Sequence, residues 1–299
     1  MNQGVDELVF LKLGGSLLTD KTRPQALRAD VLARLAAEIA AALRLRPGLR
    51  LALGHGSGSF GHMTASRYGT RAGVRTAAEW RGYAETARVA ALLNHLVVEA
   101  LWGAGVPALH IQPSASARCH DGELTDLDER PVVAGLAHGL TPVVHGDIAL
   151  DDVRGGTIIS TEQIFRWLAP RLRPQRVILV GEVAGVLTAD PDSGAPTQVL
   201  AEIHPAMGSD LTGALGGSRG TDVTGGMLAK IQEMFALMQA TPSLQHIQII
   251  SGLIPNLVQN ALIDPGLRAG TRLTHRPPDA APSPHGSRPT DDRQGHWNS

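Results

Sequence analysis

Apolar residues along the chain follow two alternating patterns. Short continuous apolar runs, most of them bounded by glycines or polar residues, are typical of strands buried on both faces of a sheet. Between these runs apolar residues recur every three or four positions, which indicates amphipathic helices. The predicted strands cover residues 8–13, 49–55, 108–112, 142–145, 176–180 and 246–251.

Helix start signals accompany the second pattern. Apolar residues recur through residues 31–43, and Asp30 is the predicted N-cap of that helix. Thr76 and Glu79 have the spacing of a capping box for a long helix that runs towards Trp102. Strands that alternate with helices predict an α/β fold, an αβα sandwich with a mainly parallel sheet covered on both faces. Two further helices are predicted over residues 161–172 and 224–238.

The end of the chain lacks both patterns. From residue 276 to residue 299 Pro, Ser, Asp, His and Gly dominate, and apolar residues nearly vanish. Such a stretch buries too little surface to offset the entropy lost on ordering, so we predict that 276–299 is a disordered tail.

Composition narrows the class of protein. The 299 residues suffice for one large domain or two fused lobes, and 43% hydrophobic with 18% charged residues is typical of a globular protein. The net charge is −1 and no basic stripe occurs, so no nucleic-acid partner is expected. The single Cys119 excludes an intramolecular disulfide and a multi-cysteine metal cluster. No apolar run reaches membrane-spanning length and residues 1–7 do not resemble a signal, so we expect no membrane contact and a cytoplasmic location.

The first strand ends in a glycine-rich turn, Lys12-Leu13-Gly14-Gly15-Ser16. Glycines directly after a strand let the backbone approach an anion closely, and their N–H groups can point at phosphate oxygens. An unpaired ammonium at the end of a buried strand is costly. Lys12 therefore either faces a phosphate or snorkels out at a strand edge. Lys21, by itself, reads as a solvated loop residue.

The second strand ends in a turn that runs from His55 to His62 through Gly56, Ser57 and Gly58. These small residues form a second candidate anion cradle. Its glycines also match the dinucleotide pattern G-x-G-x-x-G, which is weak alone. The residues after Gly61 read as a loop, and the acidic residue expected about 20 positions on would be Glu79, in a predicted helix. This context disfavours the interpretation as an NAD-dependent dehydrogenase.

Two later turns complete the set. His145-Gly146-Asp147 follows a predicted strand and, alone, favours an ordinary turn. Residues 221–227 open the helix that carries Lys230, and the free N–H groups of a helix start suit an anion. Lys230 is either a phosphate ligand or a solvated helix residue. Several glycine-rich strand ends, three separated lysines and no metal-ligand cluster suit phosphoryl transfer, although no Walker motif or H-R-D loop occurs.

Together these segments resemble the amino acid kinase superfamily and, within it, the isopentenyl phosphate kinases. The resemblance covers roughly residues 8–274. The opening K-L-G-G-S with its trailing Asp20-Lys21, and the turn from His55 to His62, match family motifs, with Ser57 in place of one glycine. Residues 111–114, 145–147 and 222–227 match further segments typical of isopentenyl phosphate kinases.

The resemblance implies ATP-dependent phosphorylation of isopentenyl phosphate by direct in-line transfer, with Mg²⁺ shielding the ATP phosphates. It implies that Lys12 and Lys230 hold phosphate groups, that Lys21 stabilises transition-state charge, and that His62 hydrogen-bonds the acceptor phosphate. Further acceptor contacts fall to Gly56, Gly58 and Asp147, and nucleotide contacts to Gly14, Gly15, Ser16, Ser57, Gly181, Gly185 and Gly226. No protein ligand for a metal is implied.

Two segments depart from the family pattern. Isopentenyl phosphate kinases usually read S-G-D-D where this chain has Ser160-Thr161-Glu162-Gln163. The first Asp of that pair is implied to orient the catalytic lysines, a role that Glu162 could fill with a longer reach. The usual T-D-V-D-G-V is 181–186 here, and Ala184 replaces its second acid. A changed substrate or reduced activity follows if either difference matters.

The resemblance also divides the chain into an acceptor-binding lobe (1–172) that carries the catalytic glycine loops and a nucleotide-binding lobe (173–275), and it implies a homodimer. In the long helix Tyr83, Ala87, Ala90 and Ala91 share one face, which either walls an apolar acceptor cavity or packs on the sheet. Two rivals remain open: a fosfomycin- or phosphonate-type kinase, whose relatives tend to lack a histidine at the position of His145, and a nucleotide-sensing protein without activity.

Overall fold

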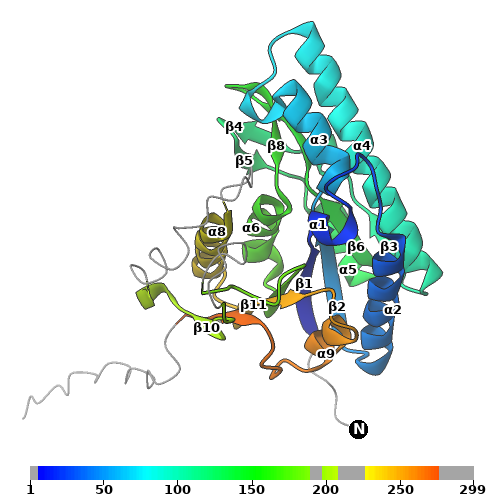
Figure 1. The fold of residues 1–299 in the computed structure, drawn as a ribbon, viewed down its shortest axis with the longest axis vertical. Helices are drawn as coiled ribbons and strands as arrows, with labels where there is room; N and C mark the ends of the chain where they lie inside the picture. Colours follow the sequence, from blue (N-terminus) through cyan, green and yellow to red (C-terminus); the bar gives the residue numbers. More distant parts are fainter. Residues whose placement is uncertain (1–5, 189–196, 208–225, 276–299) are drawn as a thin grey trace, which may run out of the picture.

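A single twisted sheet runs through the middle of the protein. The structure, a computed structural model, describes residues 6–188, 197–207 and 226–275 (Figure 1). The sheet has eight strands in the order β10-β12-β11-β9-β1-β2-β6-β3. All neighbouring strands are parallel except β11 and β12. The strands are β1 Glu7–Leu13, β2 Leu49–His55, β3 Ala108–His110, β6 Thr141–His145, β9 Arg176–Gly181, β10 Glu202–Ile203, β11 His246–Ser251 and β12 Thr271–Leu273.

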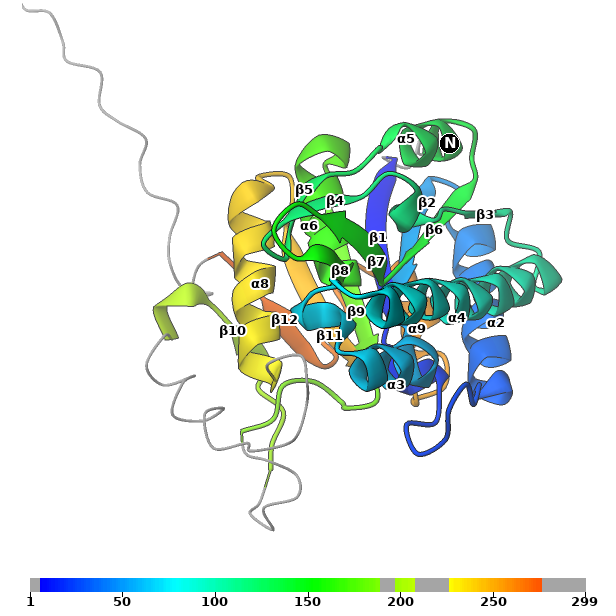
Figure 2. The same cartoon turned by 90° about the horizontal axis from the view of Figure 1, so that it is seen from above.

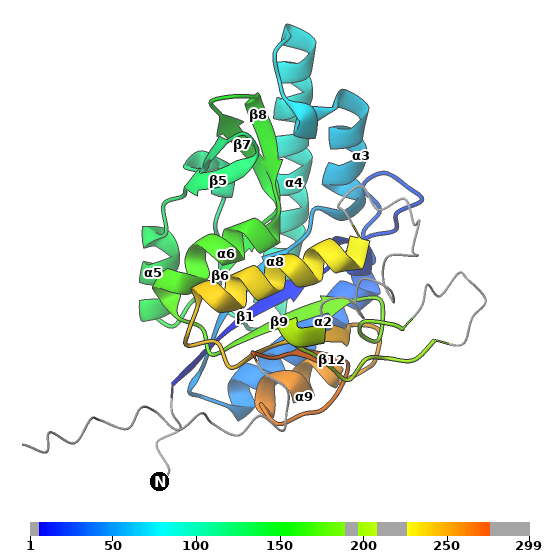
Figure 3. The ribbon, with the colours of Figure 1, turned by 90° about the vertical axis from the view of Figure 1, so that its left-hand side faces the viewer.

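Helices cover both faces of this sheet (Figure 3). One core joins Val9, Leu11 and Leu13 of β1 to apolar residues of α2, α4 and α9. The other joins Leu8 and Phe10 to residues of α5, α6 and α8. The predicted αβα sandwich is confirmed. These helices are α2 Ala29–Leu45, α4 Ala77–Gly103, α5 Arg130–Ala137, α6 Thr161–Leu172, α8 Gly226–Ala240 and α9 Leu257–Ile263.

The alternation along β1 decides where Lys12 lies. Successive side chains of a strand point to opposite faces, so Lys12 shares the face of Leu8 and Phe10. The ring of Phe10 packs against that of Phe165 in α6, with 4.8 Å between ring centroids. Lys12 is therefore presented at the carboxyl end of the central strand, on the side of α6 and α8.

A smaller sheet stands beside α4, beyond the carboxyl ends of the central strands (Figures 1 and 3). Its order is β5-β4-β7-β8. The sequence pattern predicted none of these strands, because each has only three to five residues, too few for a clear apolar run or alternation. They are β4 Arg118–His120, β5 Glu123–Asp126, β7 Asp147–Asp151 and β8 Gly155–Ile159. Short 3-10 turns cover Thr70–Ala72, Pro113–Ala115 and Pro205–Met207.

Several helix predictions can be checked directly. The capping box is confirmed, because the Thr76 hydroxyl accepts from the Glu79 N–H at 3.3 Å and the Glu79 carboxylate accepts from the Thr76 N–H at 2.8 Å. The predicted Asp30 N-cap is wrong. Helix α2 begins at Ala29, and Asp30 lies in its first turn, where a carboxylate still favours the positive end of the helix dipole.

The loop predicted after Gly61 is also wrong. Helix α3 (Gly58–Tyr68) begins within the second glycine turn, and a four-residue helix α1 (Gly15–Leu18) follows the first. The composition of α3 favours a loop. Packing overrides this local propensity, because Phe60 and Ala65 are buried and α3 lies along α4 (Figure 2). Gly82 of α4 makes this approach possible, since a Cβ there would lie 2.2 Å from the Tyr68 ring.

Two predictions fall outside the described residues: the disordered tail at 276–299 and the segment 222–225 before α8. The predicted boundary between the lobes falls between α6 and β9. Strands from both predicted lobes belong to one continuous sheet, and the division remains a prediction. Within the described ranges no helix is both long and apolar enough to span a bilayer.

Candidate active site

The two glycine turns meet at the carboxyl ends of β1 and β2, which are parallel neighbours. A Cβ on Gly15 would lie 2.4 Å from the backbone nitrogen of Gly58, and one on Gly56 would lie 2.9 Å from the nitrogen of Gly15. Side chains at these positions would push the two turns apart. The glycines therefore allow backbone-to-backbone packing of both candidate anion cradles.

Thr19 holds the two turns together. Its hydroxyl donates to the Gly15 carbonyl at 2.8 Å and accepts from the Ser59 N–H at 2.9 Å. Gly58 has a φ of +50°, and a Cβ there would lie 2.2 Å from the Thr19 hydroxyl. The sequence reasoning missed Thr19, since a lone threonine four residues after a turn gives no signal by itself.

Lys12 and Glu162 form an ion pair at this edge, with 12% and 9% of their side chains exposed. Glu162 lies in the first turn of α6, whose start is fixed by a capping box between Ser160 and Gln163. Burial alone would raise the pKa of Glu162, but the charges of Lys12 and Lys230 outweigh burial and lower that pKa. Two alternatives were given for Lys12: it faces a phosphate, or it extends into solvent at a strand edge. The largely buried pair with Glu162 supports the first, with Lys12 turned towards the carboxyl edge of the sheet.

Helix α8 contributes charges to the same place. It packs beside α6 (Figure 2). Lys230 is half-buried, and its charge acts on Glu162. Glu233 follows one turn later, and burial together with the charge of Glu162 raises the pKa of Glu233 to about 7. The sequence reasoning did not single out Glu233, because the charged groups that act on it come from three other elements, α6, β1 and β5.

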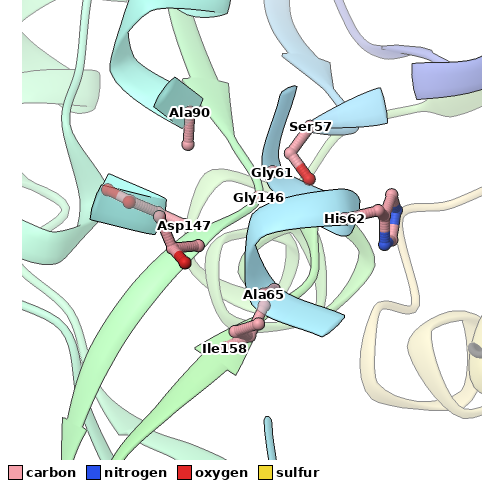
Figure 4. A pocket seen from close by; sticks show the side chains of 9 residues that line it. Ser57, Gly61, His62, Ala65, Ala90, Gly146, Asp147 and Ile158 are labelled. Carbon is pink, nitrogen blue, oxygen red and sulfur yellow. The ribbon is translucent and has the colours of Figure 1, made fainter. Parts of the chain in front are cut away.

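A small cavity opens between α3, α4 and the turn after β6 (Figure 4). Its volume is about 270 Å³, including the open space at its mouth. The predicted Ala90 lines it, whereas Tyr83, Ala87 and Ala91 do not; Thr86, one turn before Ala90, does. The lining residues are Ser57, Gly61, His62, Ala65, Thr86, Ala90, Gly146, Asp147 and Ile158.

Two buried histidines, His55 and His145, end the neighbouring strands β2 and β6. The rings of His55 and His145 stack with centroids 5.6 Å apart and planes 17° apart. His55 Nε2 lies 2.9 Å from Asn94 Oδ1. Burial lowers the pKa of each histidine to about 4, so both rings are neutral at pH 7. Only Gly146 separates the end of β6 from the start of β7, so His145-Gly146-Asp147 is a one-residue link between two strands rather than the ordinary turn that the tripeptide favoured.

Asp147 is the acid of the cavity. Burial raises the pKa of its carboxyl, which accepts backbone hydrogen bonds from Ser114 at 3.1 Å and Ile148 at 2.8 Å. His145 Nε2 lies 4.0 Å from Asp147 Oδ2 and has no hydrogen-bond partner within the described part of the chain. A polar wall therefore borders an otherwise mostly apolar cavity.

The other predicted site residues are spread around this edge. His62 lies in α3 at the rim, and its imidazole points away from Asp147 and Ala90 (Figure 4). Lys21 is exposed in the turn after α1, so contact with the charged edge is not seen in the described structure. Ser16 lies in α1. Gly14 donates to the Val180 carbonyl at 2.8 Å, which joins the first turn to the end of β9.

The predicted nucleotide-side glycines occupy two places. Gly181 ends β9 and accepts from the Gly252 N–H at 2.7 Å. Gly185 packs tightly, since a Cβ there would lie 2.6 Å from the Thr271 hydroxyl. Gly226 is the first residue of α8. Glu79, the acid that the dinucleotide pattern would need, is used in the α4 capping box, which leaves the dehydrogenase interpretation without its ribose ligand.

This geometry places two lysines and a short, open cavity at one sheet edge. Ammonium groups and free backbone N–H groups suit phosphate oxygens, and a mostly apolar cavity suits a small hydrocarbon group. Among the described residues no three His, Cys, Asp or Glu side chains cluster closely enough to hold a metal ion. The charges at this edge therefore suit a bound anion.

Comparisons with known proteins agree with this geometry. The sequence profile of the amino acid kinase family matches residues 7–251. Isopentenyl phosphate kinase of Methanothermobacter thermautotrophicus is 36% identical over 274 residues, 89% of this chain and 99% of that protein. The Haloferax volcanii enzyme of the same name is 40% identical over 233 residues, 77% of this chain and 88% of that protein.

Solved structures give the same result. An X-ray structure of isopentenyl phosphate kinase superposes with a TM-score of 0.75 at 33% identity, over 89% of this chain and 100% of that chain. The resemblance drawn from the glycine turns and lysines is confirmed. The chain belongs to the amino acid kinase family.

Proposed function

We propose that the protein transfers the γ-phosphoryl group of ATP to isopentenyl phosphate and forms isopentenyl diphosphate. The observation that carries the proposal is the Lys12–Glu162 pair, with Lys230 beside it, at the carboxyl end of β1. The turn after the neighbouring strand β2 supplies Ser57 to the small cavity. Relatives that bear the name isopentenyl phosphate kinase support the choice of acceptor.

The reaction is a direct displacement. An oxygen of the acceptor phosphate attacks the γ-phosphorus, and the bond from that phosphorus to the β–γ bridging oxygen breaks. Lys12 and Lys230 would neutralise charge as it shifts onto the transferring group and the leaving ADP. Glu162 would hold Lys12 in place. We assign Lys21 the same neutralising role from the exposed turn, where it would act once substrates are bound.

The acceptor would lie along α3 and α4. His62 and the backbone of Gly56 and Gly58 would hold its phosphate, and the cavity beside Ala90 would take the isopentenyl chain, which only area burial can hold. Mg²⁺ would bind oxygens of the ATP phosphates, as it commonly does in kinase sites. We include a cytoplasmic homodimer in the proposal, on the family resemblance alone.

A panel assay tests the proposal. MgATP is supplied with isopentenyl phosphate, dimethylallyl phosphate, fosfomycin or amino acids, and product is followed by phosphorus NMR. The largest kcat/KM is expected with isopentenyl phosphate. His62→Ala should raise the KM for that acceptor by about tenfold, the value of one charge-assisted hydrogen bond, and leave the KM for ATP nearly unchanged. A preference for fosfomycin would contradict the proposed acceptor.

A further inference from the structure

Ser57 occupies the N-cap of α3 but does not cap the helix. Serine is favoured at this position because its hydroxyl accepts a hydrogen bond from one of the first free N–H groups. The backbone of Ser57 is helical, with φ −74° and ψ −10°, and its side chain makes no capping bond. The Ser59 N–H donates to the Thr19 hydroxyl at 2.9 Å instead, and the Phe60 N–H donates to the Ser57 carbonyl at 3.2 Å. Capping therefore does not explain the Ser57 hydroxyl.

The hydroxyl lies against the first turn of α3. A Cβ on Gly61 would lie 2.5 Å from both Cβ and Oγ of Ser57, so the serine side chain occupies space that only a glycine at this position leaves open. Figure 4 shows the hydroxyl directed towards Gly61 and His62. Ser57 is half-buried and lines the cavity, and its hydroxyl has no hydrogen-bond partner among the residues that the structure describes. A hydrogen-bond donor is thus held at the cavity wall without a structural use.

The surroundings of this donor suit an anionic group. Ser57 stands between Gly56 and Gly58 in the turn after β2, and the positive end of the α3 dipole lies there. Strands β1 and β2 pair with Lys12 opposite Gly54, which brings the lysine to the same sheet edge. Hydrogen bonds to an ionised acceptor are roughly twice as strong as those between neutral groups. A phosphate oxygen is therefore the partner that this hydroxyl fits best.

The cavity decides which phosphate the hydroxyl meets. The family resemblance implies a nucleotide contact for Ser57. Its side chain, however, lines the same cavity as Ala90 and Ile158, whose apolar side chains suit the hydrocarbon group of the acceptor. In Figure 4 Ser57 and His62 lie on one side of this cavity, and Ala90 and Asp147 lie on the other. An acceptor with its hydrocarbon beside Ala90 has its phosphate on the side of Ser57.

We propose that the Ser57 hydroxyl donates a hydrogen bond to the phosphate of the acceptor, a side-chain contact that glycine at this position cannot make. The inference deepens the proposed function and rests on it, because it requires isopentenyl phosphate in this cavity. The contact is present both before and during transfer, so it acts on the affinity for the acceptor rather than on the turnover rate. Ser57 is thus a specificity-determining residue for acceptors that carry a phosphate.

Isothermal titration calorimetry tests this contact without turnover. Isopentenyl phosphate is titrated into the full chain saturated with a non-hydrolysable ATP analogue and Mg²⁺, and the analogue is titrated separately. Ser57→Ala removes only the hydroxyl and should raise the Kd of isopentenyl phosphate about tenfold, while the Kd of the analogue stays unchanged. Ser57→Gly also lacks the hydroxyl and should weaken acceptor binding to a similar degree. In steady-state assays the KM for the acceptor should rise, and kcat should stay close to the wild-type value.

A second serine of α3 supplies the matched control. Ser66 is exposed and does not line the cavity, so Ser66→Ala should leave both Kd values unchanged. Unchanged acceptor affinity in Ser57→Ala, or a loss confined to the ATP analogue, would overturn the inference. A loss in Ser57→Gly alone would do the same, because it would assign the effect to backbone freedom. If wild type binds the analogue but not isopentenyl phosphate, the proposed acceptor is wrong, and this inference falls with it.

Discussion

Each end of the central sheet carries a buried ion pair, and the two pairs are built differently. At the amino ends of β1 and β9, Arg176 and Glu7 meet with 0% and 8% of their side chains exposed. At the carboxyl end of β1, Lys12 meets Glu162. Glu7 and Lys12 lie on β1, and Arg176 lies on the neighbouring strand β9. Glu162 lies on α6, the helix that precedes β9. The two pairs are about one strand length apart.

The amino-end pair uses four of the five N–H donors of the guanidinium. Arg176 Nε donates to Glu7 Oε1 at 2.6 Å, and Nη2 donates to Glu7 Oε2 at 3.0 Å. Nη1 also donates to the carbonyl of Ala261 at 2.6 Å, and Nη2 to that of Leu262 at 3.0 Å. Arg176 is fully buried, so a ligand from solvent does not reach it. This pair joins β1, β9 and α9, and its role is structural.

The carboxyl-end pair is surrounded by unfinished contacts. Lys12 has three N–H donors, and the structure gives it one carboxylate. Burial and the charge of Glu162 raise the pKa of Glu233 to about 7. At the end of β6, His145 keeps a buried nitrogen without a partner in the described residues. The difference teaches that a fully buried pair with most of its donors used serves the fold, whereas we propose that the pair with unused donors binds a ligand.

The largest effect is expected at the amino end. Arg176→Met leaves Glu7 buried with only Arg46 as a partner, so the free energy of unfolding should fall by about 3–5 kcal/mol. Urea denaturation measures this. Arg130→Met is the control, because Arg130 is 87% exposed and its solvent-screened pair with Asp128 should contribute little to stability. A loss below about 1 kcal/mol for Arg176→Met would show that the pair is dispensable.

At the carboxyl end the effect should appear in the rate. Lys12→Ala and Lys230→Ala should each lower kcat by about 10²–10³, because each charge acts mainly as negative charge moves onto the transferring group. The Tm of Lys230→Ala should change by only a few degrees, whereas Lys12→Ala leaves Glu162 buried without its partner and should lower the Tm further. Single-turnover assays and thermal denaturation measure both, with the exposed Arg268→Ala as control. Near wild-type turnover in either lysine variant would remove that lysine from the proposed mechanism.

The smallest effect is expected in the cavity. Ala90 is 1% exposed and lines it, so Ala90→Phe should raise the KM for isopentenyl phosphate about tenfold, equivalent to about 1.4 kcal/mol. The KM for ATP should barely change, although the overpacked core should lose about 1–3 kcal/mol of stability. Ala84→Phe, on the exposed face of α4, is the control. Equal increases for both substrates would place the acceptor elsewhere.

Much of the central sheet could be predicted, because a buried strand is a continuous run of apolar residues that are adjacent in the sequence. The sequence predicted β2 and β11 with their observed bounds, and α6 as well, because each apolar run or helical repeat ends at a glycine, a cap or a charged residue. The lysines and the glycine turns could also be identified from the sequence, since small residues directly after a strand have few other roles. These features depend on residues adjacent in the chain.

The remaining features depend on distant residues. Helix α3 forms in a poor helical sequence because it packs on α4. Glu233 looks like an ordinary helix residue until α6 brings Glu162 beside it. Thr86 rather than Tyr83 faces the cavity, because the roll of a 27-residue helix about its axis is set by its neighbours and not by its own spacing.

The contact between the two glycine turns also restricts how the gene can vary. Every coding change of a glycine adds at least a Cβ, and the first atom of any side chain at Gly15 would meet the backbone of Gly58 at 2.4 Å. No larger residue can be accommodated by repacking, because the neighbour is main chain. In a saturation-mutagenesis library the codons of Gly15 and Gly58 should therefore accept only synonymous changes. A second-site suppressor would have to move the end of a whole strand.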